Sequence, residues 1–442
     1  MSRSRISSFV ALLVALCSHS NAAEPKLQAS KQWAQWRGPL ATGFAPDADP
    51  PVNWSNEKGV RWKVKIPGRG HSTPIVWGNH IFLLASTPVG KAMPPKFSGA
   101  PGAHDNLPIT HQHKFVVICV DRRFGKIVWT TPVATKLPHE GAHNSASLAS
   151  ASPVTDGERV YASFGSYGVY CLNFKGKILW KKDLGKMNTR HGHGEGTSPV
   201  LHNDKLIVNW DHEGKSFVVA FDKKTGKQRW RVDREEVTSW ASPIIVNHKG
   251  KVQLIISGTN RVRGYDVETG KSIWACGGMS RNIVASPVAG NGMVYAGSSY
   301  DKQAMVAIRL DGAQGDITGT KQVAWSRIRG TPYVPSPLLV NKSLYFLRHY
   351  QAIFTRAHAV TGKDEGTFRL GPIGNIYASP VAAADRIYVT DRRGNTMVLS
   401  HTNYGKVLGF NRLGEEVNAS LALVDNDLLI RGTTHLYCIS KP

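Results

Sequence analysis

One short pattern recurs along most of this 442-residue chain and limits what the chain can fold into. Each copy has a serine or threonine, a proline and then an apolar pair, and most copies lie about 44 residues apart. The prolines of these copies are Pro74, Pro153, Pro199, Pro243, Pro287, Pro337 and Pro380. An eighth copy has Ser420 followed by Leu421 in place of the proline. The spacing predicts one repeat architecture and argues against a series of unrelated domains.

Each repeat unit reads as four short β-strands. A proline at the first residue of a strand removes no interior ladder hydrogen bond, and the Thr-Gly turns before the last strand supply the positive φ that a tight hairpin needs. Four antiparallel strands in a unit of this length are typical of a propeller blade. We therefore predict an all-β fold over residues 61–442, an eight-bladed β-propeller with four-stranded antiparallel blades.

The two ends of the chain are predicted to meet. Seven units carry an aromatic residue on their fourth strand, at Trp129, Trp180, Trp230, Trp274, Trp325, Phe368 and Phe410. The eighth unit ends at Pro442 without one, and residues 61–67 supply a strand with Trp62 in the matching place. Pairing of the N- and C-terminal strands would close the ring without a free sheet edge. The alternative is an open array with an unpaired edge at each end.

The first residues resemble an export signal. Arg3 and Arg5 precede an apolar run, and Ser20 and Ala22 are placed for cleavage, so residues 1–23 are predicted to be a signal peptide. We therefore expect a periplasmic or secreted protein without a transmembrane segment.

Residues 24–60 are predicted to be an N-terminal arm. Its three tryptophans, Trp33, Trp36 and Trp54, favour packing on the propeller over a free tail. The four cysteines beyond the signal peptide form no C-x-x-C motif and are interpreted as small buried hydrophobic residues on strands, at Cys119, Cys171, Cys276 and Cys438.

The turns between third and fourth strands carry a family resemblance. The segments AFDKKTGKQRW (220–230), GYDVETGKSIW (264–274) and the degenerate CVDRRFGKIVW (119–129) resemble the repeats of pyrroloquinoline-quinone-type eight-bladed propellers. Similar secreted propellers are common in planctomycete-type bacterial genomes. The family includes quinoprotein alcohol dehydrogenases and the outer-membrane assembly factor BamB. The resemblance implies an envelope protein, and it implies pyrroloquinoline quinone (PQQ) with calcium as a cofactor to be tested.

The loops that enter each first strand and those that join second to third strands share one side of a propeller, called here the top face. Arginines in these loops offer planar donors for an anion, and neighbouring aromatics offer stacking surfaces. The candidate ligand-binding residues are His71, His191, His193, Glu195, Trp240, Arg261, Arg281, Arg329, Tyr333, Arg348 and Tyr377. The alternative is that these arginines pair with acidic residues of the same loops. A metal bound by His191 and His193 with Glu195 or Asp211 is also left open. A His-, Pro- and Gly-rich insertion at about residues 86–114 belongs to the same face.

The sequence favours binding over catalysis. It has no G-x-S-x-G elbow and no P-loop. The net charge of +24 fits an anionic partner, but export and the spread of basic residues argue against nucleic acid. We expect a monomeric, non-catalytic binding or scaffold protein for a cell-envelope protein or an anionic polymer at the top face. One alternative is a quinoprotein oxidoreductase, although the adjacent cysteine pair of the alcohol dehydrogenases is missing. Another is a polysaccharide-active enzyme that uses Tyr333, His191 and His193.

Overall fold

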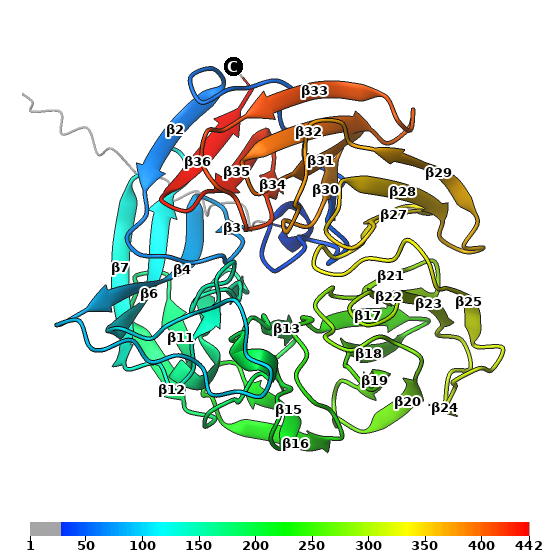
Figure 1. The fold of residues 1–442 in the computed structure, drawn as a ribbon, viewed down its shortest axis with the longest axis horizontal. Helices are drawn as coiled ribbons and strands as arrows, with labels where there is room; N and C mark the ends of the chain where they lie inside the picture. Colours follow the sequence, from blue (N-terminus) through cyan, green and yellow to red (C-terminus); the bar gives the residue numbers. More distant parts are fainter. Residues whose placement is uncertain (1–27, 442) are drawn as a thin grey trace, which may run out of the picture.

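Eight four-stranded antiparallel sheets surround a central axis in the computed structural model, which describes residues 28–441 (Figure 1). Two of these sheets gain a fifth, parallel strand at an edge, where β1 (Phe44–Ala45) joins β30 and β24 (Gly315–Asp316) joins β20. The predicted eight-bladed propeller is thus confirmed. The predicted signal peptide lies outside the described residues.

The strands follow chain order within the first seven blades. Blade one comprises β3 (Ile75–Trp77), β4 (His80–Val89), β6 (Gln112–Asp121) and β7 (Ile127–Lys136), and blade two comprises β9 (Val154–Thr155), β10 (Arg159–Ser163), β11 (Val169–Asn173) and β12 (Ile178–Lys182). Blade three comprises β13 (Val200–His202), β14 (Lys205–Trp210), β15 (Ser216–Asp222) and β16 (Gln228–Arg234), and blade four comprises β17 (Ile244–His248), β18 (Lys251–Ser257), β19 (Val262–Asp266) and β20 (Ser272–Cys276). Blade five comprises β21 (Val288–Gly290), β22 (Met293–Ser298), β23 (Ala304–Arg309) and β25 (Val323–Arg327), and blade six comprises β26 (Leu338–Val340), β27 (Ser343–Leu347), β28 (Ile353–His358) and β29 (Asp364–Arg369). Blade seven comprises β30 (Val381–Ala383), β31 (Arg386–Thr390), β32 (Asn395–Ser400) and β33 (Val407–Arg412), and blade eight comprises β34 (Ala422–Val424), β35 (Asp427–Arg431), β36 (His435–Ser440) and β2 (Val60–Lys65). Short 3₁₀ turns lie at η1 (Ala29–Lys31), η2 (Gly165–Tyr167) and η3 (Arg190–Gly192).

The ring closes where the sequence predicted. Strand β2 pairs antiparallel with β36 and places Trp62 opposite Cys438, so a strand that precedes blade one in the chain completes the last blade (Figure 1). The indole N–H of Trp62 donates to the carbonyl of Arg122 in blade one at 2.8 Å. Trp129 makes the same 2.8 Å contact with Phe174 in the next blade, so the closing contact repeats the one used elsewhere in the ring.

The repeated turn motif explains how neighbouring blades fit together. Asp222 accepts hydrogen bonds from the backbone N–H and hydroxyl of Thr225, which fixes the turn. The glycine that follows, Gly226, has φ +69, and a Cβ atom there would lie 2.9 Å from the ring of Trp180 in the preceding blade. The aspartate, threonine, glycine and tryptophan of the motif thus form one interface between blades.

The arm, defined here as residues 28–59, ties distant blades together. Trp33 is fully buried and Trp54 nearly so, which confirms that the arm packs on the propeller. Backbone carbonyls of the arm accept hydrogen bonds from blades one, two, six and seven, namely Val76 N–H to Trp33, Thr155 N–H to Ala34, Leu339 N–H to Thr42 and Ala382 N–H to Gly43. The arm therefore spans the centre of the ring (Figure 1).

Two smaller expectations concern the cysteines and membrane helices. All four cysteines are free and buried, and Cys119, Cys171 and Cys438 occupy the third strands of their blades, as predicted. Within residues 28–441 no helix is long and apolar enough to cross a membrane.

Candidate functional site

A cavity of about 520 Å³ lies at the centre of the ring, on the top face. All eight blades contribute to its lining, and Trp36 of the arm and His104 of the insertion add to it. The indole of Trp36 donates to the hydroxyl of Ser286, which places the arm at the base of the cavity. The cavity is thus a cup whose base is the arm.

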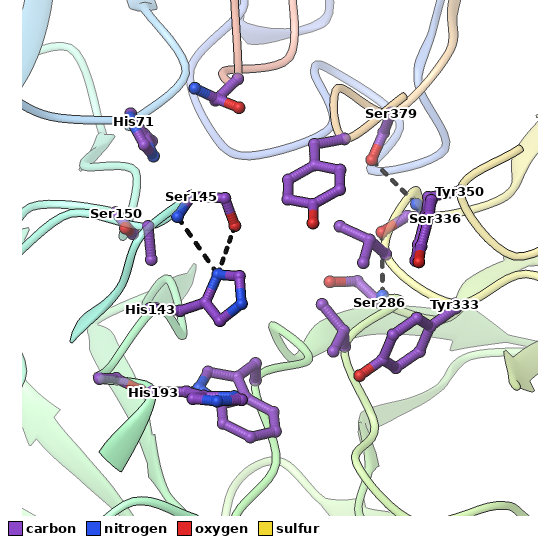
Figure 2. A pocket seen from close by; sticks show the side chains of 18 of the residues that line it. His71, His143, Ser145, Ser150, His193, Ser286, Tyr333, Ser336, Tyr350 and Ser379 are labelled. Carbon is purple, nitrogen blue, oxygen red and sulfur yellow. Dashed lines mark hydrogen bonds between the residues drawn. The ribbon is translucent and has the colours of Figure 1, made fainter. Parts of the chain in front are cut away.

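The serines of the repeated Ser-Pro pattern form a ring around this cavity, called here the serine ring. Its members are Ser152, Ser198, Ser242, Ser286, Ser336, Ser379 and Ser420, and all seven line the cavity. The hydroxyl of each serine accepts the backbone N–H of the corresponding residue in the preceding blade at 2.9–3.0 Å, beginning with Thr73 N–H to Ser152. Figure 2 shows the links among Ser286, Ser336 and Ser379. The ring explains why the repeats retain a small hydroxyl residue at this position.

Four histidines form one side of the cavity, called here the histidine wall: His71, His104, His143 and His193. The ring of His193 lies 4.7 Å from that of His104 and 4.8 Å from that of His143, measured between centroids. The insertion supplies His104 and is held over the wall because β5 (Asn106–Leu107) pairs with β8 (Ala142–His143). Figure 2 shows His71, His143 and His193 on the same side.

The environment of the histidine wall disfavours positive charge. Burial, together with the nearby His143 and His104, lowers the pKa of His193 to about 4. Burial and the charges of Arg69, Arg431 and Arg392 lower the pKa of His71 to about 3. The Nε2 atom of His71 is buried and has no hydrogen-bond partner among the described residues. These two imidazoles are therefore neutral at pH 7.

Four tyrosines form the opposite side, called here the tyrosine wall: Tyr300, Tyr333, Tyr350 and Tyr377. Tyr333 stacks on His349 with a centroid distance of 4.7 Å and an interplanar angle of 11°. Tyr350 lies 5.9 Å from Tyr377, whose ring is covered by the guanidinium of Arg392 at 5.1 Å. Figure 2 shows Tyr333 and Tyr350 across the cavity from the histidines. The wall presents aromatic rings with polar tips, which suits a flat ligand with polar edges.

Glu195 is the acidic residue set most deeply in the cavity lining. The backbone N–H and the hydroxyl of Ser166 donate to its two carboxylate oxygens at 2.7 and 2.5 Å. Burial raises the pKa of Glu195 to about 7 even though these hydrogen bonds favour the charged form. Ser166 therefore holds the carboxyl group of Glu195 in place, which leaves it little freedom to act on a ligand.

The predicted site residues divide into two groups. Six line the cavity: His71, His193, Glu195, Trp240, Tyr333 and Tyr377. The other five lie outside its lining: His191, Arg261, Arg281, Arg329 and Arg348. His191 remains close, because its ring lies 5.0 Å from that of His104.

None of the four arginines given as candidate anion-binding residues lines the cavity. Arg261 pairs with Asp316 at 2.7 Å and Arg281 with Asp301 at 3.3 Å. Arg329 and Arg348 are exposed. These loops point their long side chains outward, where water solvates the charge and a neighbouring carboxylate is within reach.

Sequence reasoning also left several lining residues out of the candidate site. Tyr300 and Tyr350 follow second strands in the top loops, as Tyr333 and Tyr377 precede first strands, so the rule that located one pair could have located the other. His104 and His143 also line the cavity, although neither was among the candidate residues. The serines of the repeat were interpreted only as the start of a strand.

The cavity does not fit the calcium-bound quinone that the family resemblance implies. Within residues 28–441, no group of three or more His, Cys, Asp or Glu side chains is placed to hold a metal ion. The lining carboxylates are Asp105 and Glu195, and both oxygens of Glu195 are engaged by Ser166. Calcium takes six to eight oxygen ligands from carboxylates, carbonyls and water, and the lining provides no cluster of carboxylates for it. We therefore assign no chemical step in the cup to such a group.

The fold and the cavity define the class of this protein as an eight-bladed propeller with a ligand-sized cup on its axis. A family model described as outer membrane protein assembly factor BamB matches residues 113–365, which is more than half of the chain. The chain belongs to this family. Comparison with curated proteins finds no match.

Solved structures share the fold at low sequence identity. BamB from Moraxella catarrhalis is 12% identical with a TM-score of 0.54, and the match covers 81% of this chain and 99% of that one. The quinohemoprotein alcohol dehydrogenase from Comamonas testosteroni is 10% identical with a TM-score of 0.65, covering 94% and 82%. A europium-containing methanol dehydrogenase is 10% identical with a TM-score of 0.53, covering 93% and 98%. At these identities the likeness is one of fold, and the site must be judged on its own residues.

Proposed function

We propose that this protein is a non-catalytic binding protein of the cell envelope, and that the cup on its top face holds a ring-bearing organic part of its ligand or partner. The observation that carries this proposal is the tyrosine wall, which faces the histidine wall across a cavity of about 520 Å³. A cavity of this size accepts a small molecule or one residue of a larger partner.

The hydrogen bonding of Glu195, the buried carboxyl group of the lining, favours binding over catalysis. Ser166 donates to both of its oxygens, so this group has little freedom to move a proton of a ligand. The Nδ1 atom of His143 accepts the hydroxyl of Ser145 at 2.6 Å, and the Nε2 atom of His193 donates to the carbonyl of His104 at 3.2 Å. These bonds orient the two imidazoles and leave the second ring nitrogen of each for a ligand.

The predicted signal peptide and the family support the location. The family model is described as an outer membrane assembly factor, and the signal sequence predicts export. An envelope protein or an anionic polymer that inserts a ring into the cup would be the corresponding partner.

Two small amides test the cup directly. Benzamide and acetamide carry the same amide group, and only benzamide has a ring to lie against the tyrosines. We expect benzamide to bind more tightly than acetamide by about tenfold, since aromatic contacts contribute about 0.5–1.5 kcal/mol beyond the area that they bury. Ligand-detected NMR on the full chain without its signal peptide measures both affinities.

A matched variant and a cofactor control complete the test. Tyr333→Ala should remove the advantage of benzamide, whereas Arg281→Gln, which changes a residue outside the cavity, should retain it. Equal affinity for the two amides in the wild-type protein would overturn the proposal. Dye reduction by an alcohol after addition of PQQ and calcium would instead establish a quinoprotein oxidoreductase.

A further inference from the structure

The serine ring carries hydrogen-bond donors that no group in the described part of the chain accepts. Each of its seven hydroxyl oxygens accepts a backbone N–H, yet none of the seven donates a hydrogen bond to an acceptor within residues 28–441. All seven side chains are at least nine-tenths buried and all line the cavity. A hydroxyl has one proton to donate. The ring therefore surrounds the cavity with O–H donors that have no acceptor among the described residues.

Two buried guanidinium groups contact the backbone at this ring or beside it. Arg37 donates to the carbonyls of Pro337 and Pro380 at 2.6 and 2.8 Å, and these prolines follow Ser336 and Ser379 of the ring. Arg431 donates to the hydroxyl of Ser72, which precedes Thr73, and to the carbonyl of Leu84 at 2.7 Å.

Neither guanidinium group has a counter-charge among residues 28–441. Their partners among the described residues are carbonyls and a hydroxyl, and neither arginine forms an ion pair with a carboxylate there. Burial alone lowers the pKa of each arginine to about 9, so both remain charged at pH 7. A buried cation is costly unless it is paired. A neighbouring anion would supply the missing partner.

The other charges around the cavity do not cancel this positive field. Burial is the main cause that lowers the pKa of His71, a lining residue, and the charge of Arg431 is one of the smaller causes. Glu195, whose pKa is raised to about 7, is only partly ionised near neutral pH, and Ser166 engages both of its oxygens. Asp105 is exposed to water at the insertion, where its charge is screened.

We propose that the serine ring, backed by Arg37 and Arg431, is an oxyanion subsite that binds the carboxylate of an organic acid. The subsite deepens the proposed function, because it places an anionic group beside the ring that the tyrosine wall would hold. Hydroxyl donors and the two cations would replace the water that a carboxylate loses on entering the cup.

Four probes separate this subsite from the proposed ring site. Benzoate and acetate are the carboxylates that correspond to benzamide and acetamide, so the set varies the charge and the ring independently. At about pH 7.5, where unperturbed histidines are uncharged, we expect each carboxylate to bind about tenfold more tightly than its amide, as hydrogen bonds to charged groups are stronger than neutral ones.

The outcomes distinguish the two proposals. If benzamide exceeds acetamide but the carboxylates gain nothing over the amides, the oxyanion subsite is overturned and the ring site stands. If the carboxylates exceed the amides but the ring adds nothing, the subsite stands and the proposed ring site falls. If no probe binds, both are overturned.

Variants locate the effect. Arg431→Gln removes a charge beside the ring and should reduce the ratio of benzoate to benzamide affinity several-fold, while benzamide binding stays unchanged. Arg281→Gln removes the same charge outside the cavity and should leave the ratio as it is. Should Arg431→Gln fail to fold, Ser336→Ala keeps both arginines and removes one O–H donor of the serine ring. An unaltered ratio in a folded Arg431→Gln or Ser336→Ala variant contradicts the proposal.

Discussion

The two walls of the cup are built from different chemistry and different parts of the chain. The histidine wall comes from blades one to three and the insertion, and packing lowers the pKa of three of its members. The tyrosine wall comes from blades five to seven, and its polar tips are uncharged phenols. One wall therefore changes its charge in acid while the other does not. The comparison shows how one repeat framework can carry a titratable surface and a constant one on either side of a single cavity.

The largest expected effect tests what the two walls share. The arm joins the blades behind both walls, and Trp33 is its fully buried anchor. Trp33→Ala should lower the free energy of unfolding by about 3–5 kcal/mol, which is typical when a buried aromatic residue is replaced by alanine. Because the arm is the base of the cup, probe binding should also weaken.

Chemical denaturation and NMR titration measure these two quantities. The exposed Leu40→Ala in the same arm is the control and should change stability by less than about 0.5 kcal/mol. If Trp33→Ala loses stability but binds benzamide as the wild type does, the arm is not the common base of the walls.

The next effect distinguishes the walls by pH. His71 has a folded pKa of about 3, below the ordinary value of about 6.5 for the unfolded chain. As the pH falls below 6.5, His71 becomes protonated in the unfolded state but stays neutral in the folded state. The folded protein therefore loses stability until the pH reaches about 3. At pH 5 this single group should cost at most about 2 kcal/mol.

His71→Gln removes that dependence and should be less sensitive to acid than the wild type. Urea unfolding at pH 7.5 and pH 5 gives the two slopes. His104→Gln, at an exposed residue of the same wall, should keep the wild-type slope. Equal slopes for His71→Gln and the wild-type protein would show that the buried histidine is not the source of acid sensitivity.

A smaller effect concerns the opposite wall. Tyr333→Phe retains the ring and removes the hydroxyl, whereas Tyr333→Ala removes both. We expect the alanine variant to lose up to about tenfold in benzamide affinity and the phenylalanine variant to lose less than about threefold, because the stacking face carries the contact. NMR titration at pH 7.5 and pH 5 should give the same ratio between the variants, since the phenol does not titrate in this range. If the ratio of the two variants' benzamide affinities changes with pH, protonation of the histidine wall affects ligand binding at the tyrosine wall.

The repeat made the architecture predictable. Counting fourth-strand aromatics left one blade incomplete and identified Trp62 as its missing member, which the pairing of β2 with β36 confirms. The motif positions are constrained by contacts within the turn, such as Thr225 with Asp222, and between blades, such as Gly226 against Trp180. Contacts that recur in every blade leave a periodic trace, and a single sequence is enough to detect it.

The cavity was only partly predictable, because the direction of a loop side chain leaves no such trace. The top-loop rule found Tyr333 and His193 but also selected Arg261 and Arg281, whose side chains turn to Asp316 and Asp301. Conversely, Arg37 and Arg431 resemble ordinary charged residues in the sequence, and only packing shows that they are buried without a carboxylate. Burial of a lone charge depends on all the surrounding elements, which a local pattern cannot encode.

The smallest expected effect comes from the arginines outside the cup. Arg261→Ala combined with Arg329→Ala removes two positive charges from the top face without changing either wall. Surface ion pairs contribute about 0–1 kcal/mol, so the loss of the Arg261–Asp316 pair should change stability by less than about 0.5 kcal/mol. Benzoate affinity should stay within about twofold of the wild type, because charges outside the cavity are screened by salt. Thermal unfolding and NMR titration check both values. A large loss of benzoate binding in this variant would show that the top-face loops outside the cavity bind the anion. The carboxylate site would then have to be assigned to those loops and not to the interior of the cup.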